Sequence, residues 1–353
     1  MASSKDYPLV DWRSVDGEGP LSAEAVEYVV AVATLAPSIH NTQPWRFVWR
    51  DGSMELYADR ARQLAVADPD GRQLHLSCGA ALLQARLAVR GLGRRVTVRL
   101  LPDPADPDLL ARLEIGPSEP GVPTPEEWAL LHAAYDRHTQ RAAFEPRRLT
   151  RPLLVDLVRA VEEEGAGLHL VEWRGERVGV AQLLAGADRR QESDPAYQAE
   201  LRRWSRFDDA TTDGIPRTAV GRGRRAMAHA EFVQRDFDVD GSVGAQEAHD
   251  EPPRGPEEPD VALLYTARDT PRDWLVGGMA LCRLLLAATC AGVAASLLDQ
   301  PVELRATREL LRWQTGIDGY PQVMLRLGYA EPAPPTPRRP VGEVLERRSP
   351  VPE

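Results

Sequence analysis

Cysteine is scarce in this chain of 353 residues, which has only Cys78, Cys282 and Cys290. No two of them form a Cys-x-x-Cys pair, and two stand inside apolar runs. This spacing argues against a disulfide framework and against a zinc site. Lysine is scarcer still, since Lys5 is the only lysine among 43 lysine and arginine residues. Because the basic residues are so strongly biased toward arginine, a single arginine is weak support for a function.

The chain also lacks an excess of positive charge and an unbroken apolar run. Its net charge of −10 argues against a general nucleic-acid-binding protein, which needs a broad basic surface. The longest apolar stretch, Leu275–Leu298, is interrupted by Gly277, Gly278, Arg283 and Gly292, so we expect no membrane-spanning helix. The first residues carry no basic region followed by an apolar one, as a secretory signal would. We therefore expect a cytoplasmic protein.

What is present is typical of a globular protein with about two domains of roughly 150 residues each. Hydrophobic residues make up 43% of the chain and charged residues 27%. Apolar residues spaced by three and four predict helices, and alternating ones predict strands, which together indicate an α+β fold. The predicted helices cover residues 23–35, 74–91, 126–135, 152–164, 174–206, 274–292 and 305–315. The predicted strands cover residues 45–49, 54–57, 95–101, 168–173, 261–266 and 322–328.

Two stretches show no sustained periodicity. The proline-rich segment Pro102–Pro125 predicts a linker or a long connection. The polar segment Asp208–Glu258 is too long for a passive connection, so we expect either a lid or a disordered segment.

Two parts of the chain share one order of predicted elements: helix, loop, strand, insertion, long apolar helix, strand. Their long helices, at residues 74–91 and 274–292, are both rich in alanine, leucine and glycine. Because the identity is slight, the similarity has two explanations, coincidence or the fusion of two related units. In a fused pair, a site formed once at the seam needs different groups from each unit.

The most informative stretch is the loop Ala36–Trp45, with the sequence APSIHNTQPW. Between its two prolines it holds Ser38, Asn41, Thr42 and Gln43, which can offer both donors and acceptors to a polar heterocycle. Composition by itself favours the simpler interpretation, a capped turn between a helix and a strand. The longer pattern, however, resembles the Ala-Pro-Ser-x-x-Asn-x-Gln-Pro-Trp-x-Phe motif of the flavin-dependent nitroreductase superfamily. The resemblance implies that Pro37, Ser38, Asn41 and Gln43 contact FMN.

Three further stretches resemble FMN-binding elements of that superfamily. The first is Arg-His-Thr-Gln-Arg at residues 137–141, which resembles the Arg-x-Ser/Thr-x-Arg/Lys element that holds the FMN phosphate and ribityl chain. Guanidinium groups can donate paired hydrogen bonds to phosphate oxygens. The resemblance implies contacts from Arg137, His138, Thr139 and Arg141. The basic pair Arg338 and Arg339, after the last predicted strand, resembles the pair that returns to the phosphate. The loop containing Leu298, Asp299 and Gln300 resembles the one along the isoalloxazine, although Gln300 replaces a usual glycine.

Each of these elements occurs in one unit only, which implies one composite site and one FMN per chain. This arrangement resembles the Acg-type actinobacterial branch, which fuses two nitroreductase-like domains. The resemblance implies two domains at residues 1–122 and 123–353, each a mainly antiparallel sheet flanked by helices. It also implies a lid at about residues 208–258. Because fusion already buries the seam, we expect a monomer or a weak homodimer.

The resemblance implies an FMN-dependent oxidoreductase that reduces or oxidises a small organic molecule, with NAD(P)H as a possible electron donor. His40, His138 and Tyr320 are the candidate proton donors, and no catalytic residue is assigned. The alternative is an FMN storage or sequestering protein, in which a fully closed lid blocks both hydride donor and acceptor. No Ser-His-Asp triad, metal-ligand spacing or Gly-x-Gly-x-x-Gly fingerprint after a strand is evident.

Overall fold

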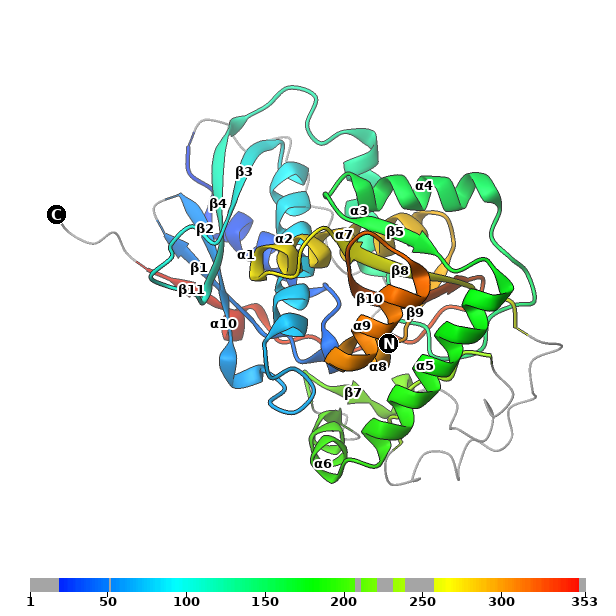
Figure 1. Cartoon of the computed structure of the whole chain (residues 1–353). Coiled ribbons are helices and arrows are strands. Elements are labelled where there is room, and N and C mark those ends of the chain that lie inside the picture. The colour runs from blue at the N-terminus through cyan, green and yellow to red at the C-terminus, as the bar shows by residue number, and fades with distance from the viewer. Residues whose placement is uncertain (1–18, 51, 207–210, 221–230, 239–256, 349–353) are drawn as a thin grey trace.

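The computed structural model of the chain describes residues 19–50, 52–206, 211–220, 231–238 and 257–348. Within these residues the fold consists of two main sheets with two long helices between them (Figure 1). The expected α+β class, with mainly antiparallel sheets flanked by helices, is confirmed.

The first sheet has the strand order β11-β1-β2-β4-β3. Its strands are β1 (Trp45–Arg50), β2 (Ser53–Ala58), β3 (Arg94–Leu100), β4 (Leu109–Ser118) and β11 (Leu345–Arg347). All neighbours are antiparallel except β1 and β11, which pair in parallel with Phe47 opposite Leu345. The C-terminal strand therefore closes the edge of a sheet that is otherwise built from the first part of the chain.

The second sheet has the strand order β5-β8-β10-β9, and all its pairs are antiparallel. Its strands are β5 (Gly167–Leu170), β8 (Asp260–Thr266), β9 (Ala294–Leu297) and β10 (Tyr320–Gly328). The order and directions match those of β1-β2-β4-β3 in the first sheet. In both, a 20-residue helix connects the second strand to the third along the chain: α2 (Arg72–Gly91) after β2 and α7 (Pro271–Cys290) after β8.

The helices α2 and α7 pack against each other through glycines on both. A Cβ atom at Gly79 would lie 2.2 Å from the Leu275 carbonyl oxygen, and one at Gly278 would lie 2.0 Å from the Leu76 carbonyl oxygen. The contact is reciprocal, because each glycine meets the residue three positions before the other. Only glycine permits so close an approach of two backbones, which explains the small residues in both helices.

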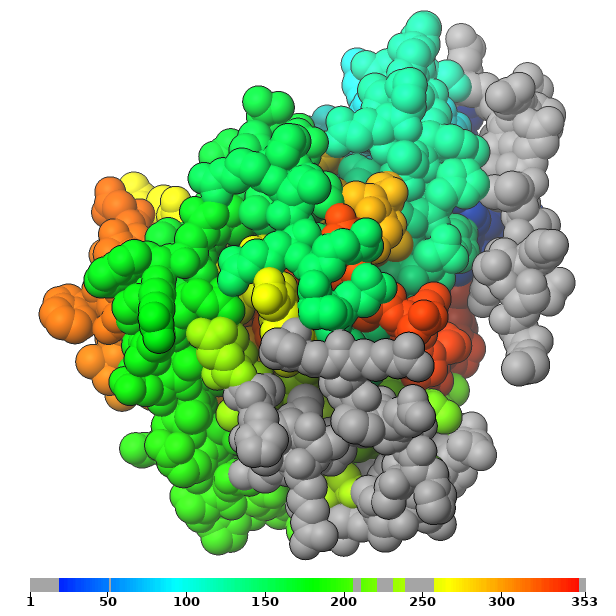
Figure 2. Space-filling view, turned by 90° about the vertical axis from the view of Figure 1, so that its right-hand side faces the viewer, coloured from blue at the N-terminus to red at the C-terminus, as the bar shows by residue number. Residues whose placement is uncertain are grey.

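Most of the other helices pack against α2 or α7 or contact strand β10 of the second sheet. These other helices are α1 (Ala23–Thr34), α3 (Pro125–Asp136), α4 (Arg151–Glu162), α5 (Arg174–Glu192), α6 (Pro195–Trp204), α8 (Gln300–Glu303), α9 (Arg305–Thr315) and α10 (Val341–Val344). A small two-stranded sheet pairs β6 (Ser205–Arg206) with β7 (Ile215–Pro216). In Figure 2 the red C-terminal residues lie against the blue-green residues that follow α3, where the Gln140 side chain donates to the Glu331 carbonyl oxygen at 2.7 Å.

The structure corrects several predicted elements. The segment 102–125 contains strand β4, which its prolines concealed. The predicted helix 174–206 is two helices, because Asp194 caps the start of α6 and Pro195 cannot continue α5. Strand β9 was not among the predicted strands.

The longest apolar stretch of the sequence forms helix α7 and the residues that follow it. By length and composition α7 could cross a membrane. Most of α7 is nevertheless buried inside the molecule, where it packs against α2. A buried core helix satisfies the same test.

Candidate functional site

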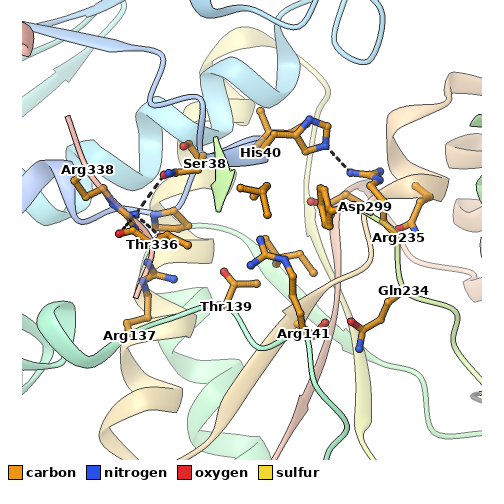
Figure 3. Close-up of a pocket in the computed structure, with 18 residues that line it drawn as sticks. Ser38, His40, Arg137, Thr139, Arg141, Gln234, Arg235, Asp299, Thr336 and Arg338 are labelled. Atoms are coloured by element: carbon orange, nitrogen blue, oxygen red, sulfur yellow. Dashed lines mark hydrogen bonds between the residues drawn. The ribbon is translucent and has the colours of Figure 1, made fainter. Parts of the chain in front are cut away.

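Most of the predicted flavin-contacting residues surround one cavity of about 80 Å³, which we call the arginine pocket (Figure 3). Six separate segments of the chain meet there. Its lining consists of Pro37, Ser38, Ile39, His40, Asn41, Arg137, Thr139, Arg141, Ile215, Gln234, Arg235, Phe237, Ser296, Leu297, Asp299, Gln300, Thr336 and Arg338. In Figure 3, Arg137 and Arg338 lie at one end of the pocket, and His40, Asp299 and Arg235 lie at the other.

The loop after α1 reaches the pocket through an uncommon backbone conformation. His40, Asn41 and Gln43 have φ angles of 46°, 55° and 49°, in the left-handed region that costs roughly 1–2 kcal/mol per non-glycine residue. Two kinds of hydrogen bond hold this conformation. The Gln43 N–H donates to Ser38 Oγ at 3.0 Å, and the Asn41 side chain donates to the Gly214 and Pro337 carbonyl oxygens at 2.9 and 3.1 Å. Strain of this kind gathers at functional sites.

Three arginines of the pocket have no carboxylate among the charged groups that act on them within the described residues. Arg137 is buried and donates to the Leu35 carbonyl oxygen at 3.2 Å. Arg338 donates to the same oxygen at 3.2 Å and to Asn41 Oδ1 at 3.3 Å. Burial and the neighbouring Arg137 lower the pKa of Arg338 to about 9. Burial, Arg137 and Arg235 lower the pKa of Arg141 to about 10. These guanidinium groups repel one another, so an anion would stabilise them.

Buried nitrogens that have no partner among the residues that the structure describes mark the same end of the pocket. They are the Nε atoms of Arg137 and Arg338 and the Nδ1 atom of His138. Burial, and then Arg137 and Arg338, lower the pKa of His138 to about 4. His138 therefore adds no charge at neutral pH, and the positive potential comes from the arginines.

At the other end of the pocket, a buried chain of polar contacts joins His40 to α8. Arg235 donates from Nη1 to His40 Nε2 at 2.9 Å and from Nη2 to Glu303 Oε2 at 2.6 Å. Since arginine only donates, His40 Nε2 accepts, and the imidazole is neutral with its proton on Nδ1. Burial and the charges of Arg235 and Arg141 hold the pKa of His40 well below its usual value.

The loop between β9 and α8 supplies a carboxyl group to the pocket. Burial, with the nearby Glu303, raises the pKa of Asp299 to about 7, so this group is partly protonated at neutral pH. The neighbouring Gln300 donates from its side chain to Asp188 at 3.2 Å. Leu298 lies behind the loop, fully buried, with its N–H bonded to the Met324 carbonyl oxygen at 2.8 Å.

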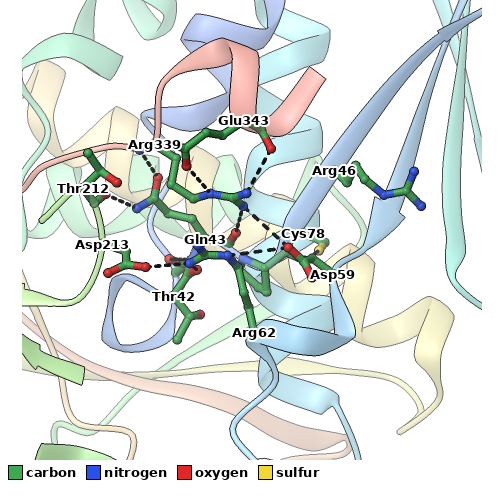
Figure 4. Close-up of polar contacts among 12 residues, drawn as sticks. Thr42, Gln43, Arg46, Asp59, Arg62, Cys78, Thr212, Asp213, Arg339 and Glu343 are labelled. Carbon is green, nitrogen blue, oxygen red and sulfur yellow. Dashed lines mark hydrogen bonds and ion pairs between the residues drawn. The ribbon is translucent and has the colours of Figure 1, made fainter. Parts of the chain in front are cut away.

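Gln43 and Arg339, which were also predicted to contact FMN, lie outside the lining and fasten neighbouring segments together (Figure 4). The Arg339 N–H donates to Gln43 Oε1 at 2.8 Å, and Gln43 Nε2 donates to the Thr212 carbonyl oxygen at 2.9 Å. The Arg339 guanidinium is directed toward Gln43 and Glu343 instead of the pocket. His138 and Leu298 are likewise absent from the lining.

The sequence predicted a lid at residues 208–258 but did not indicate which of its side chains line the pocket, and it indicated no contact from Thr336. Most of Asp208–Glu258 lies outside the described residues, but its described parts bring Ile215, Gln234, Arg235 and Phe237 into the lining. Phe237 stands edge-on to His40, with ring centroids 5.6 Å apart. The irregular pattern of this segment predicted a lid without indicating which side chains face the pocket.

No family model matches the chain. It is 32% identical to the putative NAD(P)H nitroreductase Rv3131 of Mycobacterium tuberculosis, over 94% of this chain and 96% of that protein. It is 31% identical to the putative NAD(P)H nitroreductase acg of the same organism, over 93% of this chain and 97% of that protein. Among solved structures, it resembles the FMN-dependent nitroreductase NfnB of Mycobacterium smegmatis with a TM-score of 0.34 and 16% identity, covering 58% of this chain and 88% of that chain.

Proposed function

The chain belongs to the nitroreductase family that includes the Acg proteins, and we propose that it is an FMN-binding oxidoreductase with one flavin in the arginine pocket. The observation that carries the proposal is that Arg137, Arg141 and Arg338 have no balancing carboxylate in the described part of the chain. A dianionic phosphate supplies that charge and accepts charge-assisted hydrogen bonds from several guanidinium groups.

The chemistry of the pocket fits FMN, although its present volume does not. Arg137 Nε and Arg338 Nε, for which the described residues supply no partner, are donors for phosphate oxygens, and Thr139 adds a hydroxyl. A cavity of about 80 Å³ is far below the roughly 300 Å³ at which ligand pockets begin. We therefore expect FMN binding to displace the side chains that the predicted lid contributes, Phe237 among them.

When bound, the flavin would supply hydride or electron transfer to a small organic acceptor, and NAD(P)H would be the electron donor. The protein residues would position the flavin and exclude water. Arg137, Arg141 and Arg338 would hold the phosphate end. Asp299, with a pKa of about 7, would hold or release a proton on its carboxyl group at neutral pH. His40 would offer no positive charge, because its Nε2 is occupied by Arg235.

We also propose that the chain is a fused pair of nitroreductase-like domains divided at residues 122 and 123. The shared strand order of the two sheets and the reciprocal glycine contact of α2 and α7 support this division. The C-terminal strand β11 crosses back to the first sheet, so the two units are interlocked. We further propose that the protein is cytoplasmic and that it is a monomer or a weak homodimer.

The flavin content of the purified protein tests the function. The protein should be yellow, or should take up FMN in a calorimetric titration, with one FMN per chain. NADPH should bleach the bound flavin, and a quinone should restore its colour with turnover. A colourless protein that binds no FMN would refute the proposal, and a ratio near two would refute the single composite site.

One observation favours a second function, the storage or sequestering of FMN. Ile215, Arg235 and Phe237 narrow the pocket, and Arg235 is fixed by both His40 and Glu303. A lid held in this way would keep NADPH and acceptor away from the flavin. Bleaching by dithionite but not by NADPH would identify storage, and quinone turnover with NADPH would exclude it.

A further inference from the structure

Arg141 of the arginine pocket belongs to residues 139–145, a segment outside the helices and strands, which we call the arginine strap. The guanidinium groups of Arg137 and Arg235 repel that of Arg141 and would drive it out of the pocket if the strap were free to move. Because no helix or strand fixes the strap, the side chains around it must bond its backbone. One of them is Gln140, whose Oε1 accepts the Arg141 N–H at 2.9 Å.

A second set of contacts to the strap comes from Arg326 of β10, which is fully buried. Its Nη1 donates to Glu257 Oε1 at 2.6 Å, and its guanidinium lies 5.0 Å from the centre of the Phe144 ring. The other oxygen of Glu257, Oε2, accepts the Phe144 N–H at 3.1 Å. Within the described residues, Glu257 is the carboxylate that pairs with Arg326. This ion pair therefore packs directly against the strap.

Gln234 connects the same guanidinium group to Arg141. When its side-chain amide is oriented so that each atom meets a complementary group, Gln234 donates to the Arg141 carbonyl oxygen at 3.1 Å and accepts from Arg326 Nη2. Gln234 is buried and lies beside Arg141 in Figure 3. Both backbone polar groups of Arg141 are thus bonded to glutamine side chains, and one of these glutamines is held by Arg326.

The burial of Arg326 is not explained by stability alone. Removing an ion pair from water costs free energy that its attraction often fails to recover, and an apolar pair of the same volume is commonly as stable. Neither Arg326 nor Glu257 lines the arginine pocket. What the cation does contribute is a directed hydrogen bond to the glutamine that bonds Arg141, which an apolar side chain could not make.

We propose that Arg326 is a positioning residue of the arginine pocket, which acts through Gln234 to keep Arg141 directed at a bound phosphate. The proposal rests on the proposed function, because it assumes that the pocket binds FMN. Without Arg326, the bond from Gln234 to the strap would loosen, and repulsion between the guanidinium groups would move Arg141 outward. Affinity for the phosphate should then fall, while contacts to the flavin ring remain.

Fluorescence titration of the full-length protein with FMN and with riboflavin tests this role. Arg326→Met/Glu257→Gln removes both charges together, so no charge is left buried without its partner, and the new amide oxygen can still accept the Phe144 N–H. FMN affinity should fall at least tenfold, and riboflavin affinity should change less than threefold. The matched control is Arg308→Met/Asp269→Asn, which removes an ion pair of the same 2.6 Å length outside the pocket lining and should leave both affinities unchanged.

The possible outcomes separate this inference from the proposed function. A wild-type protein that binds no FMN would refute the proposed function and this role with it. A wild type that binds FMN, with a double variant of equal FMN affinity, would overturn the role of Arg326 alone. Equal losses for FMN and riboflavin would show a merely structural role and would also overturn it.

A third substitution tests whether Arg326 acts through Gln234. Gln234→Leu leaves the ion pair of Arg326 and Glu257 intact, so it provides a test even where the double variant does not fold. By itself it should lower FMN affinity at least tenfold. Added to Arg326→Met/Glu257→Gln, it should lower the affinity by less than a further threefold, because both changes break one connection. Losses that multiply would show independent effects and overturn the proposal, as would unchanged FMN affinity of Gln234→Leu.

Discussion

Removal of Arg137 and Arg338 together should separate recognition of the FMN phosphate from recognition of the ring. Each guanidinium can make charge-assisted hydrogen bonds to phosphate, worth roughly 1.5–3 kcal/mol apiece. Even with strong non-additivity, Arg137→Ala/Arg338→Ala should lose about 3 kcal/mol of binding free energy. Since about 1.4 kcal/mol corresponds to a factor of ten, FMN affinity should fall at least about a hundredfold. The protein should stay folded, because the two arginines bond mainly to carbonyl oxygens and repel each other.

Riboflavin is the matched ligand for this measurement, because it carries the same ring without the phosphate. Fluorescence titration of both ligands should show a large loss for FMN and little change for riboflavin. Arg148→Ala is the control variant, since Arg148 is exposed and lies outside the pocket lining. FMN affinity within a factor of three of the wild type would refute the phosphate site. Equal losses for FMN and riboflavin would point to a collapsed pocket and would also contradict the reasoning.

Two further predictions concern stability. Burial raises the pKa of Asp299 from 3.8 to about 7, so the folded state binds this proton more tightly, and its stabilising effect is lost as pH rises through 7. Asp299→Asn should therefore melt above the wild type at pH 8 and lose that advantage below pH 4; a pH-independent difference in melting temperature would contradict this. Gly278→Ala should destabilise the fold by roughly 1–3 kcal/mol or more in denaturant titrations, because its Cβ would meet the Leu76 carbonyl oxygen. Gly186→Ala on α5, with open space around its Cβ, should be neutral or stabilising by up to about 1 kcal/mol. If both substitutions changed the free energy of unfolding equally, the close contact between α2 and α7 would be contradicted.

Local sequence patterns correctly predicted the elements whose ends follow from backbone chemistry, such as the inability of proline to continue a helix. The end of α1 before Pro37 and the strand that begins at Trp45 follow from apolar spacing and proline chemistry. The break between α5 and α6 was available from Asp194 and Pro195 but was hidden within a long helical pattern. Strand β4 was missed because its pairing with β2 and β3 is non-local, and prolines flank it.

The pocket residues that belong to short sequence motifs could be predicted. The pocket residues that are brought together only by contacts between distant segments could not. Ser38, Asn41, Arg137 and Arg338 were identified by short motifs, and the fold brings them to one cavity. The neighbouring Arg339 belongs to the same basic pair, yet its side chain is directed away from the pocket. Nothing in a linear pattern determines which of two adjacent arginines faces inward. The role of Arg235 was equally invisible, because its partners His40 and Glu303 are far away in sequence.

The matching topology of the two sheets raises the question of why one pocket, rather than two, should bind a phosphate. The loop between α1 and β1 has its counterpart in the short turn between α4 and β5, at residues 163–166. That turn carries Glu163 and Glu164, whose carboxylates form ion pairs with Arg283, and Glu164 also pairs with Arg86. The arginines there are neutralised by the protein itself, and the added carboxylates would repel a phosphate. Two units with the same strand order thus differ in the charge of their corresponding loops, because residues 35–44 contain no acidic residue whereas Glu163 and Glu164 are carboxylates, and this difference supports one flavin per chain.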